Sequence, residues 1–232
     1  LALGDAAKPF VELAHAVNSI SVKIISVVMY FTPVGVFCSI ASVIYANGKD
    51  TIIALGAVLA ALYLTMFLYS LIVYGGIVKL LGKCNIKDFF VKVLPAALNA
   101  FGTCSSSATL PISKRCADSL DVPNEISALT LPLGATINMD AVSIVMSFMI
   151  VFFANACGQE ISFGMLAVVL LSNTLLSIGT PGVPGGAIAS FAALAAIAGL
   201  PAGVMGVYIS VNTLCDMGAT CCNVLGDLAC SV

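Results

Sequence analysis

The stretch VNTLCDMGATCCNVLGDLAC, residues 211–230, places polar side chains in the most apolar part of the chain. No Asp, Glu, Lys, Arg or His occurs in the preceding residues 161–215. The polar side chains are Asp216, Thr220, Asn223 and Asp227. At about 100° per residue in a helix, their spacing of i, i+4, i+7 and i+11 puts them on one narrow stripe. The stretch therefore predicts a helix with a polar stripe in apolar surroundings.

The composition indicates that these surroundings are lipid. Of 232 residues, 60% are hydrophobic and 9% are charged, and the mean hydropathy is +1.12. Soluble domains carry about 25% charged residues. Residues 24–48 and 51–78 are uncharged and long enough to cross a hydrocarbon core of about 30 Å as helices. We therefore predict an all-α membrane protein, and the net charge of −2 indicates no nucleic-acid partner.

Basic residues predict the topology. Lys79, Lys83, Lys87 and Lys92 form one cluster, and Lys114 and Arg115 form the next. The positive-inside rule places both clusters on the cytoplasmic side and an expected loop at residues 47–50 outside. Within the segment 88–118, the stretch between Lys92 and Lys114 has about the length of one span, yet both of its flanks are basic and so lie on the same side. It therefore predicts a re-entrant hairpin whose tip is GTCSSS, and irregular backbone at that depth must be buried in protein or line a cavity.

A second interrupted segment follows. The apolar run is broken by SIGTPGVPGGAI, residues 177–188, whose glycines and prolines cannot continue a helix. Its length also allows two ordinary spans, but a re-entrant hairpin over 161–198, entered from outside, mirrors the first. A span at 124–157 follows the first hairpin, and a last helix at 202–232 follows the second. This pattern favours an inverted repeat with a binding site near the bilayer midplane.

Three carboxylates, those of Asp140, Asp216 and Asp227, lie in these segments without a Lys or Arg to neutralise them. An intramembrane carboxylate costs several kcal/mol unless it meets a partner or a cation. Internal hydrogen bonds are one alternative, and cations or protons from outside are the other. Oxygen-rich neighbours suit a hard ion such as sodium. These neighbours are Thr136, Asn138, Ser177, Thr180 and Asn223.

Five motifs together resemble the glutamate transporter family, the dicarboxylate/amino acid:cation symporters. They are PVGVF (33–37), SSSATLP (105–111), LPLGATINMD (131–140), SIGTPGVPGG (177–186) and CDMGATCCNVLGD (215–227). The resemblance implies a homotrimer in the membrane lipid, with a scaffold and a transport domain that moves as an elevator. Residues 1–48 would belong to the trimerisation scaffold and 51–232 to the transport domain. It also implies a chain truncated at both ends, without the first three helices and most of the fourth.

The resemblance implies three sodium sites. One uses the carbonyls of Gly134, Asn138 and Asn223 with the carboxylate of Asp227. A second uses the carbonyls of Thr136, Ser177, Ile178 and Thr180. A third uses Asp140 and Asn138, with its other ligands on a helix outside this sequence.

The resemblance also implies a substrate site. Ser106 and Asn223 would hold the α-carboxylate, Asp216 would pair with the α-ammonium, and Thr220 would orient that group. The tip at 183–187 would close over the substrate as the outer gate. The expected substrate-binding residues are Cys104, Ser105, Ser106, Val142, Val183, Pro184, Gly186, Ala187, Asp216, Ala219, Thr220 and Asn223.

Departures from the family pattern predict the substrate. Members that carry acidic amino acids place an Arg where this chain has Ala219 and a Thr where it has Val142, and some carry an Arg where it has Cys104. Burying a second substrate carboxylate without a cation would cost too much free energy. The carboxylate of Asp216 still needs a positively charged partner such as an ammonium group. We therefore expect sodium-coupled uptake or exchange of a neutral L-amino acid such as alanine, serine or threonine. An acidic amino acid or a dicarboxylate is the alternative.

Two other classes remain as alternatives. An intramembrane aspartyl protease needs two aspartates that share a proton, and Asp140 and Asp227 are the available pair, but neither lies in the sequence motif of that class. A channel is the other. We expect a carrier rather than an enzyme, with several spans in the cell membrane, specifically the inner membrane of a bacterium.

Overall fold

The computed structural model describes residues 8–232, in which every regular element is helical. This confirms the all-α fold class; residues 1–7 of the expected scaffold segment lie outside the described residues. The elements are α1 (Lys8–Met29), α2 (Thr32–Tyr69), the π-helical turn η2 (Ser70–Tyr74), α3 (Gly75–Leu80), α4 (Ile86–Thr103), α5 (Ser106–Ser119), α6 (Asn124–Ile137), α7 (Asp140–Ala156), α8 (Phe163–Ile178), α9 (Ala187–Ile197) and α10 (Val204–Ala229).

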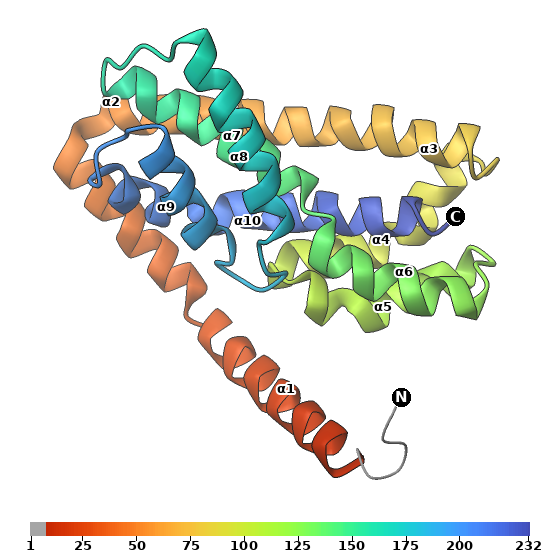
Figure 1. The fold of residues 1–232 in the computed structure, drawn as a ribbon. Coiled ribbons are helices and arrows are strands. Elements are labelled where there is room, and N and C mark those ends of the chain that lie inside the picture. Colours follow the sequence, from red (N-terminus) through yellow and green to blue (C-terminus); the bar gives the residue numbers. More distant parts are fainter. Residues whose placement is uncertain (1–7) are drawn as a thin grey trace.

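Helix α10, which carries the polar stripe, lies at the centre of the molecule. It packs against α2, α4, α5, α6 and α7, and Figure 1 shows it between α2–α3 and α4–α6, whereas α1 leads away from this group. Of its 26 residues, 17 are buried. A helix that is covered around most of its circumference is an interior helix, so the polar stripe faces other helices.

Two expectations for the N-terminal part are wrong. The expected span at 24–48 is interrupted at residues 30–31, where α1 ends and α2 begins, because Pro33 occupies the first turn of α2 and is favoured at a helix start. The expected loop at 47–50 is part of the continuous helix α2. Gly48 alone is a poor helix former there, and its cost of about 1 kcal/mol does not end the helix.

Among the described residues, 53–80 and 124–156 are long and apolar enough to cross a membrane.

The first hairpin consists of α4 and α5, which pack on each other. Its turn is formed by Cys104, in the left-handed conformation with φ 50°, and Ser105. A left-handed residue is a common end of a helix, and the Ser105 hydroxyl caps the next one by accepting the amide N–H of Ala108 at 3.1 Å. The predicted tip is therefore where the chain reverses.

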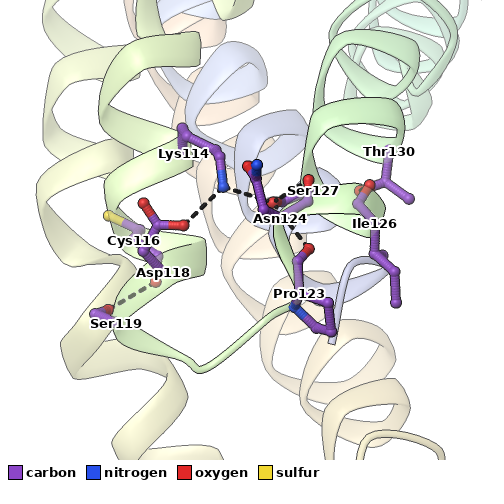
Figure 2. A network of polar contacts seen from close by, with 9 residues as sticks. All are labelled: Lys114, Cys116, Asp118, Ser119, Pro123, Asn124, Ile126, Ser127 and Thr130. Atoms are coloured by element: carbon purple, nitrogen blue, oxygen red, sulfur yellow. Dashed lines mark hydrogen bonds and ion pairs between the residues drawn. The ribbon is translucent and has the colours of Figure 1, made fainter.

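Polar contacts fix the other end of this hairpin to α6 (Figure 2). The Nζ of Lys114 donates to Oδ1 of Asp118 at 2.7 Å and to Oγ of Ser127 at 2.8 Å. The Ser119 hydroxyl donates to the Cys116 carbonyl at 2.6 Å. The Lys114–Ser127 bond joins α5 to α6 at the end of the hairpin away from its turn, and the other two bonds lie within α5.

The second hairpin consists of α8, a turn at 179–186, and α9. The hydroxyl of Ser162 caps α8 by accepting the N–H of Met165 at 3.2 Å. At the open end, Nε2 of Gln159 donates to the Ala198 carbonyl at 2.8 Å. The turn contains Gly185 at φ +75°, a conformation that glycine adopts without strain.

The expected span at 124–157 is two helices, because α6 and α7 are separated at Asn138 and Met139. The N–H of Ala141 donates to Oδ1 of Asn223 on α10 at 2.9 Å, so a partner from another helix satisfies a backbone group of the first turn of α7. This break brings the backbone of residues 138–141 against the polar stripe.

Candidate substrate and ion site

The polar stripe of α10 is buried. The exposed fractions are 9% for Asp216, 5% for Thr220, 2% for Asn223 and 5% for Asp227. The ion pairs Lys92–Asp88 and Lys114–Asp118 do not involve them. The two aspartates of the stripe are therefore held by hydrogen bonds.

The turn of the second hairpin binds Asp216. The N–H of Gly185 donates to Oδ2 of Asp216 at 2.9 Å, and the Thr220 hydroxyl approaches Oδ1 at 3.4 Å. A carboxylate accepts up to about four hydrogen bonds. Asp216 thus keeps acceptor capacity for a further donor.

The turns of the two hairpins meet at Gly182. Its carbonyl accepts the Ser105 hydroxyl at 3.0 Å and the N–H of Ser107 at 3.3 Å. A Cβ at Gly182 would lie against the carbonyl oxygen of Ala135 and 3.3 Å from Cβ of Ser106. Only glycine allows the second turn to approach α6 and the first turn this closely.

A narrow cavity lies where these turns meet α7 and α10. It is lined by Cys104, Ser106, Met139, Val142, Thr180, Pro181, Gly182, Val183, Ala187, Asp216, Thr220 and Asn223. Eight of these are among the expected substrate-binding residues: Cys104, Ser106, Val142, Val183, Ala187, Asp216, Thr220 and Asn223.

The other four expected substrate residues do not line the cavity. Ser105 is buried and bonded to Gly182, and Ala219 is 2% exposed. Pro184 and Gly186 are half-buried in the second turn. A Cβ at Gly186 would meet the carbonyl of Pro181, so this glycine shapes the turn.

The residues of the first expected sodium site are neighbours. Nδ2 of Asn138 donates to Oδ1 of Asp227 at 2.8 Å and to the Asn223 carbonyl at 3.1 Å. A Cβ at Gly134 would lie 2.7 Å from Cγ of Asp227, which puts the carboxylate against the backbone of α6. Carboxylate and carbonyl oxygens in one place are the ligands that a hard cation takes, so the residues present fit sodium.

The groups of the second expected site lie at the end of α8 and the end of α6. The Ser177 carbonyl accepts the N–H of Thr180 at 3.0 Å, and these two residues are buried while Ile178 is 47% exposed. Thr136 is exposed, and its hydroxyl bonds to Leu133 and Pro132 within its own helix. No bond among the described residues joins Thr136 to the other three.

The third group centres on Asp140, where sequence reasoning missed two residues. The hydroxyls of Tyr69 and Tyr74 donate to Oδ2 of Asp140 at 2.8 and 2.6 Å. The only signal in the sequence was that both tyrosines stand in an otherwise apolar span. Met139 was missed as well, since its contact with α10 comes from a break between helices that has no helical periodicity. Gly185 lies within the expected tip at 183–187, but its bond to Asp216 was not predicted.

Asp140 and Asp227 do not form a protease-like pair in the described hydrogen bonds. Asp140 accepts from two tyrosines, while Asp227 accepts from Asn138. An aspartyl dyad shares one proton between its carboxyl groups, and no such bond joins these two.

Comparison with known proteins bears on the family to which the chain belongs. The model of the sodium:dicarboxylate symporter family matches residues 1–232. The chain belongs to this family. It is 31% identical over 97% of its length to mouse excitatory amino acid transporter 2, of which it covers 40%.

Other similar proteins are named as neutral amino acid transporters. The chain is 30% identical over 97% of its length to rabbit neutral amino acid transporter B(0), covering 42% of it, and 30% identical to human neutral amino acid transporter A, covering 43%. The chain thus spans less than half the length of these relatives. Both acidic and neutral amino acid transporters are similar to it at nearly the same identity, so overall similarity does not distinguish the two substrate classes.

Proposed function

We propose that the protein transports a neutral L-amino acid, such as alanine, serine or threonine, together with sodium. The observation that carries this proposal is the charge of the cavity lining: among the described residues that line the cavity, Asp216 has the only charged side chain. One carboxylate matches the ammonium of an amino acid. A second carboxylate on the substrate would be buried without a cation, which is strongly unfavourable.

Asp216 and the second hairpin turn would recognise the amino group together. The N–H of Gly185 donates to one acceptor position of the Asp216 carboxylate. A substrate ammonium would bind the acceptor positions that remain. Charge-assisted hydrogen bonds are about twice as strong as neutral ones. Binding of the ammonium therefore favours a turn held close to Asp216, with the substrate enclosed.

Asn223 would bind the substrate carboxylate. Its Oδ1 is fixed by the N–H of Ala141, while its Nδ2 points to the thioether of Met139 at 3.3 Å. A thioether is a weak acceptor, so the Nδ2 group would form a stronger hydrogen bond with a carboxylate oxygen of the substrate. The cavity-lining Ser106, at the start of α5, would add a donor at a helix N-terminus, where anions bind readily.

Sodium would bind at Asp227 with carbonyl oxygens of α6 and α10. When bound, it supplies positive charge to the buried carboxylate of Asp227, which forms no ion pair with a Lys or Arg in the part of the chain that the structure describes. The Asn138 side chain joins Asp227 to Asn223, and Asn223 lines the substrate cavity. Ion and substrate would thus be linked through neighbouring residues, which is the physical basis of coupled binding.

We further infer the setting from family membership and hydropathy. The two hairpins would be re-entrant, and residues 51–232 would move as an elevator against a scaffold in a homotrimer. The protein would be a multi-pass carrier, not an enzyme, in lipid contact in the inner membrane of a bacterium.

Uptake of labelled amino acids by the full-length protein in liposomes tests this proposal. Alanine or serine should accumulate with a sodium gradient and not when choline replaces sodium. The variant Asp216→Ala should lose uptake, because the substrate ammonium would be buried without its partner at a cost of about 3–5 kcal/mol. Uptake that persists in choline would refute sodium coupling, and normal uptake by the variant would refute the role of Asp216.

A further inference from the structure

A π-helical turn brings two tyrosines to one carboxylate. In η2 the chain widens, and the N–H of Gly75 reaches the carbonyl of Ser70, five residues back. In an α-helix, residues five apart point about 140° away from each other, as follows from about 100° per residue. A π-turn reduces this angle, because its repeat is close to five residues. Tyr69 and Tyr74 can therefore both face α7.

Both hydroxyls donate to the same oxygen. Tyr69 and Tyr74 approach Oδ2 of Asp140 at 2.8 and 2.6 Å, and their rings meet edge to face with centroids 5.2 Å apart. A carboxylate oxygen has about two acceptor positions, so Oδ2 is saturated. The other oxygen, Oδ1, accepts one bond, at 3.1 Å, from the N–H of the next residue, Ala141.

Helix α10 makes room for this arrangement. Tyr74 is 2% exposed, and a Cβ at Gly226 would lie 2.7 Å from its hydroxyl oxygen. Glycine at this position lets the phenol pass between α10 and Asp140. The same Cβ would lie 2.6 Å from Nδ2 of Asn138, the group that holds Asp227. The tyrosine pair thus adjoins the proposed sodium ligands.

We propose that Tyr69 and Tyr74 are positioning residues for a sodium ion at Asp140. They saturate Oδ2, hold the carboxylate in one orientation and leave Oδ1 as the oxygen that binds the ion. The π-turn at 70–74 exists to bring both hydroxyls to this oxygen. The inference rests on the proposed sodium coupling and adds two residues and one element to it.

Sodium binding to purified full-length protein tests this inference, read from the rise in melting temperature with sodium concentration, because a ligand of the folded state stabilises it. Tyr74→Phe and Tyr69→Phe should each raise the sodium concentration for half-maximal stabilisation by about tenfold, since a hydrogen bond to a charged group is lost. Tyr63→Phe is the matched control. Its hydroxyl, on the same helix, donates to the Leu214 carbonyl at 2.6 Å, so its sodium response should not change.

A double variant separates positioning from general packing. In an Asp140→Asn background, Tyr74→Phe should cause no further loss of sodium affinity, because the two residues act through one bond. Unshifted sodium binding in both single variants, an equal shift in Tyr63→Phe, or additive losses in the double variant would overturn the inference while leaving sodium coupling intact. A wild-type protein that does not respond to sodium would overturn the proposed function and this inference together.

Discussion

Among single residues, we expect the largest effect on sodium dependence from a change at Asp227. Asp227→Asn should raise the sodium concentration needed for uptake roughly a hundredfold, because removing one partner of a buried charge pair costs about 3 kcal/mol or more. The amide keeps the shape of the side chain and removes its charge. The measurement is the sodium dependence of alanine uptake.

Asp88→Asn is the control for this experiment. The Asp88 side chain is 69% exposed and faces Lys92 at 3.7 Å, and such surface pairs contribute about 0–1 kcal/mol. Its sodium dependence should equal that of the wild type. If Asp227→Asn also behaves like the wild type, then Asp227 does not bind the ion.

Specificity is expected to reside at Ala219 and Val142. These residues are 2% and 4% exposed. The double change Ala219→Arg and Val142→Thr should recruit aspartate, because an Arg–carboxylate pair is strong and geometrically selective. It should weaken alanine uptake, since the guanidinium would then be buried without an anion. A change of about 3 kcal/mol would shift the preference roughly a hundredfold.

Competition between labelled alanine and unlabelled aspartate measures this shift. Each single variant should give a smaller shift than the pair. A double variant that is folded, transports alanine and still ignores aspartate would contradict the assignment of these positions to substrate selection.

The residue scale also shows what the sequence could and could not predict. The stripe from Asp216 to Asp227 follows from helical periodicity alone, and its burial agrees with that prediction. The partners of Asp140 did not follow from periodicity, because Tyr69 and Tyr74 share a face only through a π-turn. Local irregularity of this kind depends on tertiary contacts with α7 and α10.

At the scale of elements, the second hairpin turn depends on glycine. Gly182→Ala should abolish or severely reduce uptake, because its Cβ would meet the Ala135 carbonyl and push the turn away from α6 and the first hairpin. Overpacking of this kind costs about 1–3 kcal/mol. The measurement is alanine uptake at matched protein abundance in the membrane.

Gly164→Ala is the matched control, because it lies in α8 of the same hairpin and a Cβ there would meet nothing within 4 Å. Its uptake should be close to that of the wild type. Equal activity of the two variants would show that the close approach at Gly182 is not needed for transport.

The elements differ in how well their sequences predict them. Both hairpin turns were predicted at the right residues, because glycines, prolines and a run of serines mark chain reversals locally. The break between α6 and α7 was not predicted, since Asn138 bonds to Asp227 and Ala141 bonds to Asn223 on another helix. The continuous α2 was not predicted either, because the polar residues at 47–50 are typical of a loop, whereas helix α2 continues through them.

At the scale of the molecule, one interior helix connects the proposed functions. Helix α10 contacts both hairpins, α2 and the broken α6–α7 pair, and it carries Asp216 at the proposed substrate cavity and Asp227 at the proposed ion site. Charged residues on an interior helix destabilise a fold unless ligands or partners neutralise them. Substrate and sodium would therefore bind to the same helix.

The most direct test of this account is a competition assay with the full-length, unmodified protein in liposomes. Uptake of labelled alanine, driven by sodium, is measured against rising concentrations of unlabelled serine or aspartate. We predict that serine competes well and that aspartate does not, because the described residues of the cavity lining offer one carboxylate and no cation. Aspartate competing as well as serine would contradict the account.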